Sequence, residues 1–231
     1  MLLEPDARGY ERIVIDLALA RDLGDGLVPM IAHEAHHVLR EAVHVVARPR
    51  PERPEDDLFA ALDNLQAEGV ADQIDKRDYL AGKTWGPEPS QRLWARMHAR
   101  FVEAHRSADE SLARMDRLLA AYARDPHDPR DPGTARELGR ELRDSLVLGG
   151  HPVGFYMAGA ILEAFGRERL IERVGDPFAF VEDYSAAAAR LGGGRHVFGA
   201  EALAGVARLR DVYATAATVG ELTRRGLDAG L

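Results

Sequence analysis

The chain has no cysteine among its 231 residues. This absence excludes disulfide bonds, catalysis by a thiolate and zinc sites with cysteine ligands. No run approaches the roughly 18 uninterrupted apolar residues of a membrane span, and the first residues lack the basic start and apolar core of a signal peptide. We therefore expect no membrane span and a cytoplasmic location, with secretion or periplasmic export left open should the natural N-terminus be longer.

Clustered positive charge is also missing. The formal net charge is −8, and no basic stripe with interleaved aromatic residues occurs. Because binders of nucleic acid and of anionic membranes meet phosphates with basic patches, the sequence argues against both classes. Lysine occurs only at positions 76 and 83 among 30 basic residues, a bias that favours a GC-rich genome over a functional reason.

What the chain does contain is a short motif, because residues 33–37 read His-Glu-Ala-His-His and match His-Glu-x-x-His. The apolar residues around it predict a buried helix over about residues 27–47. On a helix, residues i and i+4 lie on one face, so His33 and His37 can bind one metal ion. Glu34 can take a proton from a zinc-bound water without itself binding the metal. The motif predicts two zinc ligands and a general base.

A catalytic zinc site needs a third protein ligand. The apolar spacing predicts a second helix over about residues 57–76, on which Asp63, Glu68 and Asp72 are candidates. Glu68 and Asp72 stand one turn apart. If Glu68 binds the metal, Asp72 can accept the N–H of a ligand histidine and fix its orientation. One helix would then carry both the third ligand and its support.

His-Glu-x-x-His followed by Glu-x-x-x-Asp on the next helix resembles the gluzincin metallopeptidases, such as thermolysin. Residues 150–158, Gly-His-Pro-Val-Gly-Phe-Tyr-Met-Ala, resemble the C-terminal part of an uncharacterised family of zinc-dependent peptidases of gluzincin type. The resemblance covers roughly residues 10–80 and 148–190. It implies one zinc ion held by His33, His37 and Glu68, with Asp72 as the support. The sequence departs from thermolysin in its longer interval before Glu68 and in Ala67, where an asparagine is common.

The resemblance also implies a fold, which we expect to be mainly α with a small N-terminal β-sheet (α+β, zincin-like). Residues 12–19 are largely apolar and partly β-branched, which predicts an edge strand that would pair with an extended peptide. The Pro- and Asp-rich residues 125–132 predict a linker between a metal-binding part, residues 1–124, and a C-terminal helical subdomain, residues 133–231.

Gluzincins generally stabilise the oxyanion of the reaction with Tyr or His donors from their C-terminal part. The resemblance therefore points to His151 and Tyr156 as further catalytic residues. His151 lies just before a predicted helix with Pro152 in its first turn. The alternatives are structural, since Tyr156 fits a core position and His151 a helix cap.

Other metal-site classes fit the sequence less well. A metzincin requires Gly and a third His where this chain has Arg40 and Val43, and His44 lies about 10 Å along the helix from His37, too far to bind the same ion. A di-iron helical protein draws its Glu-x-x-His motifs from different helices, whereas the two matches here, residues 34–37 and 41–44, lie in one predicted helix. A non-catalytic binding module with a peptidase fold remains an alternative. The sequence predicts a zinc metallopeptidase acting on a peptide or protein substrate; its cleavage preference and oligomeric state stay open.

Overall fold

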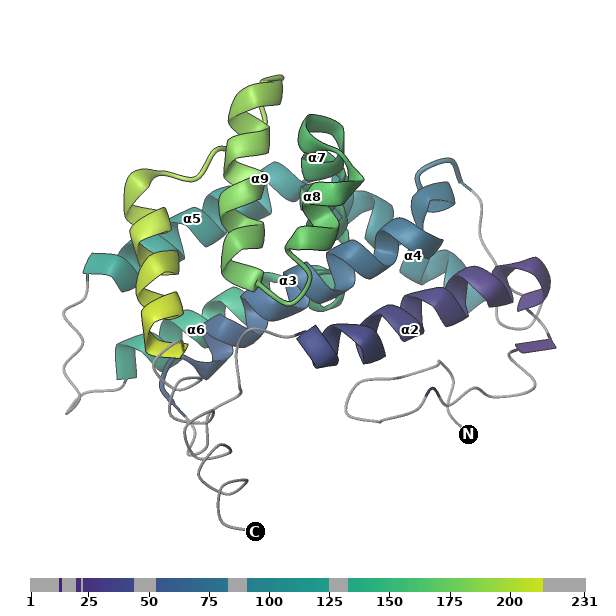
Figure 1. The fold of residues 1–231 in the computed structure, drawn as a ribbon, viewed down its shortest axis with the longest axis horizontal. Coiled ribbons are helices and arrows are strands. Elements are labelled where there is room, and N and C mark those ends of the chain that lie inside the picture. The colour runs from purple at the N-terminus through teal and green to yellow at the C-terminus, as the bar shows by residue number, and fades with distance from the viewer. Residues whose placement is uncertain are drawn as a thin grey trace, which may run out of the picture.

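The computed structural model describes residues 13, 20–21, 23–43, 53–82, 91–124 and 133–213. These residues form helices joined by short turns (Figure 1). The elements are η1 (Gly24–Gly26), α2 (Leu27–Val43), α3 (Asp56–Asp75), η2 (Arg77–Tyr79), α4 (Gln91–Arg106), α5 (Ala108–Arg124), α6 (Gly133–Ser145), η3 (Val147–Gly150), α7 (His151–Phe165), α8 (Arg167–Glu172), α9 (Pro177–Leu191) and a last helix over residues 200–213.

The prediction of a small N-terminal β-sheet is wrong for the fold that the structure describes. No strand occurs among the described residues, which are helices and turns. The segment expected to form the edge strand, residues 12–19, lies outside the described residues except for Ile13. The prediction of a mainly helical fold is confirmed. In the described residues helices pack on helices to form the core, where the resemblance implied a sheet.

Helix α3 is the central element, running between α2 on one side and α6, α7 and α9 on the others (Figure 1). Its sequence has alanine, glycine and leucine on several faces, so neighbours can approach all round it. The closest approach is at Gly69, where an added Cβ would stand 2.3 Å from the carbonyl oxygen of Gly154 on α7. Two glycines therefore allow α3 and α7 to cross almost backbone to backbone.

One hydrophobic cluster of buried side chains runs through the described helices. It includes Leu62 and Leu65 from α3, Leu119 from α5, and Phe180 and Tyr184 from α9. Residues from both sides of the predicted linker thus contribute to the same cluster. The division into a metal-binding part and a C-terminal subdomain stays a prediction.

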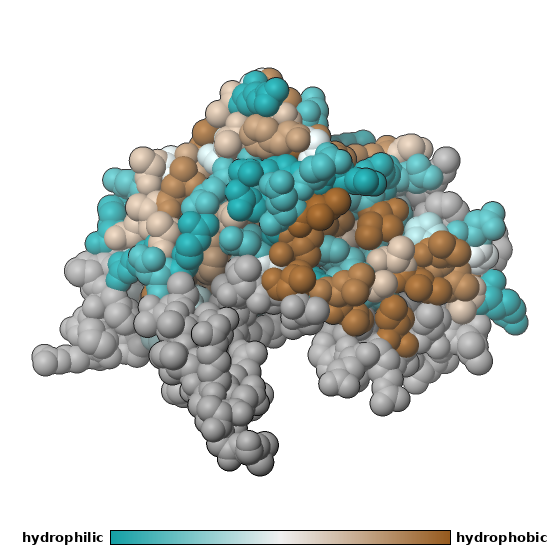
Figure 2. Space-filling view, viewed as in Figure 1, coloured by the Kyte–Doolittle hydropathy of each residue, from teal (hydrophilic) through white to brown (hydrophobic). Residues whose placement is uncertain are grey.

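Helix α2 packs on α3 with one face and exposes apolar side chains on another. Val28 is 73% exposed, Leu39 69% and Val43 55%. Figure 2 shows hydrophobic surface gathered where α2 lies in Figure 1. The predicted motif helix of about residues 27–47 matches α2 from its start to Val43, and residues 44–47 lie outside the described residues.

Among the described residues, no single helix has the length and apolar character needed to cross a membrane. The bent pair Thr134–Ser145 and Val147–Phe165, which meet at 93°, passes that test only when the two are taken together. The second member of this pair is largely buried within the hydrophobic cluster.

Candidate metal centre

The face of α2 turned towards α3 carries the motif residues. His33 is 5% exposed and His37 7%, whereas Leu39, between His37 and the end of the helix, faces outward. Glu34 is also buried, at 8%. The helical period explains this division, since positions 33, 37 and 40 share one face of α2. The motif therefore lies in the interface between two helices.

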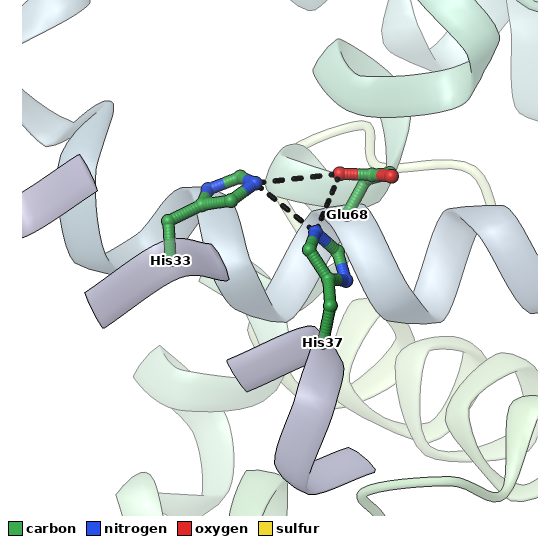
Figure 3. A group of neighbouring side chains, drawn as sticks. All are labelled: His33, His37 and Glu68. Atoms are coloured by element: carbon green, nitrogen blue, oxygen red, sulfur yellow. Dashed lines mark hydrogen bonds and ion pairs between the residues drawn. The ribbon is translucent and has the colours of Figure 1, made fainter. Parts of the chain in front are cut away.

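Glu68 on α3 meets both motif histidines (Figure 3). Its Oε2 lies 3.3 Å from Nε2 of His37 and 3.6 Å from Nε2 of His33. The two Nε2 atoms are 3.1 Å apart. Three electron-pair donors from two helices thus converge on one point.

The three distances fit a zinc ion held by these side chains. Zinc bonds of about 2.0–2.1 Å in a tetrahedral site place neighbouring donor atoms about 3.3–3.5 Å apart. The observed 3.1, 3.3 and 3.6 Å bracket that range. Two imidazoles and one carboxylate also form a donor set used in catalytic zinc sites, which keep a fourth position open.

The charges of this cluster favour an anionic Glu68. Burial by itself raises its pKa, but hydrogen bonds from His33 and His37 and the nearby charge of His151 lower the pKa far below its usual range. Burial also acts to lower the pKa of His33, yet the carboxylates of Asp75 and Glu68 outweigh it and raise that pKa to about 9. With a pKa of about 9, His33 holds its proton at neutral pH when no cation is bound.

Asp75 is the residue that orients His33. Oδ1 of Asp75 lies 3.0 Å from Nδ1 of His33. Asp72, which the sequence suggested for this role, is further away, with Oδ1 at 3.6 Å. A histidine that donates from Nδ1 keeps its Nε2 electron pair for a metal, so the contact with Asp75 fixes the tautomer that a ligand needs. Asp72 remains close enough to His33 to support it electrostatically.

His151 joins the cluster from the start of α7. Its Nδ1 lies 2.9 Å from Oδ2 of Asp72, and its Nε2 lies 3.4 Å from Oε2 of Glu68. Gly150, with φ of 97°, ends the turn just before it in a left-handed conformation that glycine adopts readily. The side chain of His151 is 25% exposed, against 3% for that of Glu68. It is therefore the member of the cluster that solvent or a ligand reaches most easily.

Two residues named from the sequence have other partners. The hydroxyl of Tyr156 donates to Oδ2 of Asp109 at 2.9 Å, and its catalytic role stays a prediction. Asp63, one of the candidates for the third ligand, pairs with Arg40 in a buried contact between α2 and α3. Arg40 also donates to Oε1 of Gln66 at 2.6 Å. These contacts hold the two helices that carry the donor atoms side by side.

Two further groups of His and acidic side chains overlap this one. They consist of His33, Asp72 and Asp75, and of Glu68, Asp72 and His151. Both contain Asp72, and the ammonium of Lys76 lies 2.5 Å from Oδ1 of that residue. Because the ammonium already neutralises Asp72, a second cation there would meet a like charge. The group of His33, His37 and Glu68 is the better candidate for a metal site.

Sequence reasoning missed Asp75 and Lys76. Asp75 follows Asp72 by three residues and Glu68 by seven, so the helical period places all three on one face of α3. That spacing was a usable signal, but it does not say which aspartate meets His33, because the answer depends on how far α2 is shifted along α3.

Comparison with known proteins decides the family. A family model described as "Putative zinc dependent peptidase (DUF5700)" matches residues 3–192. The chain belongs to this family. The match spans α2, α3 and α7, and thus the cluster of His33, His37 and Glu68 as well as His151. No curated protein and no solved structure matches the chain.

Proposed function

We propose that this chain is a zinc metallopeptidase in which His33, His37 and Glu68 hold one zinc ion. The observation that carries the proposal is the convergence of these three donors at 3.1–3.6 Å from two different helices. The family description names the same metal and the same class of reaction. Two histidines from one helix and a glutamate from the next follow the order seen in gluzincins, which supports assigning this type of site.

Zinc held there would act as a Lewis acid towards a peptide carbonyl and make a water molecule easier to deprotonate. Glu34 is the residue that would accept the proton of that water. It follows His33 directly on α2 and is buried at the same helix interface. A general base must lie within hydrogen-bond reach of the proton that it takes, and Glu34, as the neighbour of a proposed zinc ligand, is the carboxylate that we assign to this role.

His151 would hold the oxygen that becomes negative during the reaction. Its ring lies beside the cluster, stacked at 6.3 Å from that of His33, and it is partly exposed. Asp72 fixes the ring through Nδ1, so Nε2 faces the site. In its protonated form His151 donates from both nitrogens and stabilises an anion next to Glu68.

The test combines metal analysis with cleavage of a mixed peptide pool. We expect one zinc per chain and cleavage that stops on chelation and returns with zinc. Glu34→Gln should keep the zinc and lose turnover, because the amide cannot accept the proton, whereas His33→Ala should lose the metal. Peptidase activity at the wild-type level in either variant would refute these roles.

The same measurements separate the alternatives. A non-catalytic binding module would hold zinc without cleaving any peptide in the pool, and a di-iron protein would contain two irons per chain. Cleavage that is insensitive to chelators would remove the zinc from the mechanism altogether.

A further inference from the structure

Lys76 lies directly after α3 and contacts two carboxylates of that helix at once. Its Nζ donates to Oδ1 of Asp72 at 2.5 Å and to Oδ2 of Asp75 at 3.4 Å. The side chain is 16% exposed, so little water competes for these contacts. The ammonium of Lys76 thus bridges the carboxylates of Asp72 and Asp75.

Each of the two carboxylates holds a different histidine with its other interactions. Oδ1 of Asp75 lies 3.0 Å from Nδ1 of His33 on α2, within hydrogen-bond distance. Oδ2 of Asp72 lies 2.9 Å from Nδ1 of His151 on α7. The two histidines come from different helices, α2 and α7, both of which pack on α3. Lys76 thus contacts both carboxylates from one side, and His33 is the other described residue close to both, at 3.0 Å from Asp75 and 3.6 Å from Asp72.

We propose that Lys76 is a positioning residue shared by two arms of the site, the metal arm (Asp75 and His33) and the substrate arm (Asp72 and His151). This inference rests on the zinc peptidase function proposed above. Lys76 touches neither donor atoms nor substrate; it acts by holding Asp72 and Asp75 where each accepts the Nδ1 proton of one histidine. Both Nε2 atoms are then directed into the site.

A compact ammonium suits this place better than a guanidinium. Lysine presents a point charge with three donors in any direction, whereas arginine presents a planar fork that matches one carboxylate at a time. Asp72 is fully buried, and Lys76 reaches it from the end of the same helix, four residues on. In a chain with 30 basic residues of which two are lysine, this position holds one of the two.

The first experiment compares Lys76→Met with Arg77→Met. Arg77 is the next residue, is exposed and loses the same charge, so it controls for the net-charge change. We expect Lys76→Met to weaken zinc binding about 10-fold or more, the usual effect of losing support behind a ligand, and to lower kcat as well. Arg77→Met should change neither. Zinc affinity is measured by competition with a chromogenic chelator, which does not depend on peptidase activity.

The two arms are separated with Asp75→Asn and Asp72→Asn. Asp75→Asn should weaken zinc binding about 10-fold or more. Asp72→Asn should leave zinc affinity within about threefold of wild type and lower kcat, with KM little changed, because its main partner is His151. Equal effects of both variants on zinc affinity would overturn the division into two arms.

A chemical rescue covers the possibility that Lys76→Met does not fold. The chain has no cysteine, so the thiol of Lys76→Cys can be alkylated alone in the unfolded protein. Aminoethylation restores an ammonium at nearly the position of Nζ, and treatment with iodoacetamide gives a neutral side chain of similar length. We expect the aminoethylated protein to refold and bind zinc nearly as wild type, and the neutral one to bind it about 10-fold more weakly or not to refold.

The outcomes distinguish this inference from the function on which it rests. If wild type binds zinc and cleaves peptides while Lys76→Met does both equally well, Lys76 has no positioning role and the peptidase stands. The inference also fails if the aminoethylated and neutral proteins behave alike. If wild type itself binds no zinc, the proposed function fails first.

Discussion

Two polar clusters flank α7, and they contain similar side chains in different arrangements. What we call the metal-ligand cluster consists of His33, His37 and Glu68, the zinc ligands proposed above. The loop cluster consists of Asp109, Asp116 and His196, joined by Tyr156. In the loop cluster each carboxylate meets a donor: Asp109 accepts from the Tyr156 hydroxyl at 2.9 Å and from the backbone N–H of His196 at 2.8 Å. Asp116 lies 3.1 Å from Nε2 of His196 and accepts from the N–H of Gly199.

The metal-ligand cluster brings acceptors together instead. With Nδ1 of His33 turned to Asp75, its Nε2 faces Nε2 of His37 and the Glu68 carboxylate. Such a group is satisfied only by a proton or a cation in the middle. The comparison shows that composition alone does not identify a metal site, because histidine and aspartate also hold loops to helices. The direction of the electron pairs separates the two cases.

The largest expected effect comes from removing a histidine from each cluster. His37→Ala should reduce bound zinc from one per chain to none, because only two donors remain. His196→Ala should keep one zinc and lose only fold stability. The zinc content of both variants is measured by elemental mass spectrometry after gel filtration. Retention of zinc by His37→Ala would show that the donors of Figure 3 do not form the site.

The next largest effect concerns α7, which carries His151 to one cluster and Tyr156 to the other. A Cβ at Gly154 would stand 2.3 Å from the carbonyl oxygen of Leu65, so Gly154→Ala must push α7 away from α3. We expect a loss of about 1–3 kcal/mol or more in the free energy of unfolding. Urea unfolding of the zinc-loaded protein measures it.

Gly159→Ala on the same helix is the matched control. A Cβ there meets nothing nearer than Nε2 of Gln73 at 4.0 Å. Alanine also stabilises a helix interior by about 0.5–1 kcal/mol relative to glycine. The control should therefore unfold at equal or higher urea concentration. Similar destabilisation by both variants would mean that the close crossing of α3 and α7 is not what Gly154 provides.

The pH dependence of zinc binding tests the metal-ligand cluster in a second way. Because the pKa of His33 is raised to about 9, zinc must displace a proton at neutral pH, and its affinity should rise up to about tenfold per pH unit until near pH 9. The stability of the metal-free protein should change in the opposite direction. A raised pKa stabilises the folded state fully below 6.5, and this contribution is lost as the pH rises through 9.

Titration with a chelator of known proton binding measures the affinity, and thermal unfolding of the stripped protein measures the stability. Affinity that is flat between pH 7 and 9 would contradict the raised pKa of His33.

The smallest expected effect is that of Tyr156→Phe, which removes the hydroxyl that binds Asp109. We expect a loss of about 1 kcal/mol of stability, the net worth of one hydrogen bond, with kcat retained. His151→Ala, by contrast, should lower kcat while keeping zinc. A fall in kcat for Tyr156→Phe of the size seen for His151→Ala would instead support a catalytic tyrosine.

The sequence permitted prediction of the parts of the site that depend on local periodicity. His33 and His37 follow from the spacing within one helix, and the predicted helix of about residues 57–76 matches α3, which carries Glu68. The roles of these residues still await metal analysis. The partner of His33 could not be predicted, because Asp72 and Asp75 lie on the same face and only the packing of α2 on α3 chooses between them.

The fold was predictable as mainly helical, and the sheet was the error. That expectation came from the apolar and partly β-branched residues 12–19 and from the resemblance to gluzincins, in which strands precede the motif helix. In the described part of the chain α3 fills the centre and is covered by helices. The Gly69–Gly154 contact that makes this packing possible joins residues 85 positions apart. A contact over that separation cannot be predicted from a local sequence pattern.

The apolar outer face of α2 affects how the protein is to be handled. This helix supplies two of the three donors, packs mainly on α3, and presents Val28, Leu39 and Val43 to its surroundings. A metal ion bound by both α2 and Glu68 would fix α2 on α3. Stripped samples should consequently be prone to colloidal self-association, visible as growing light scattering that zinc, added early, reverses.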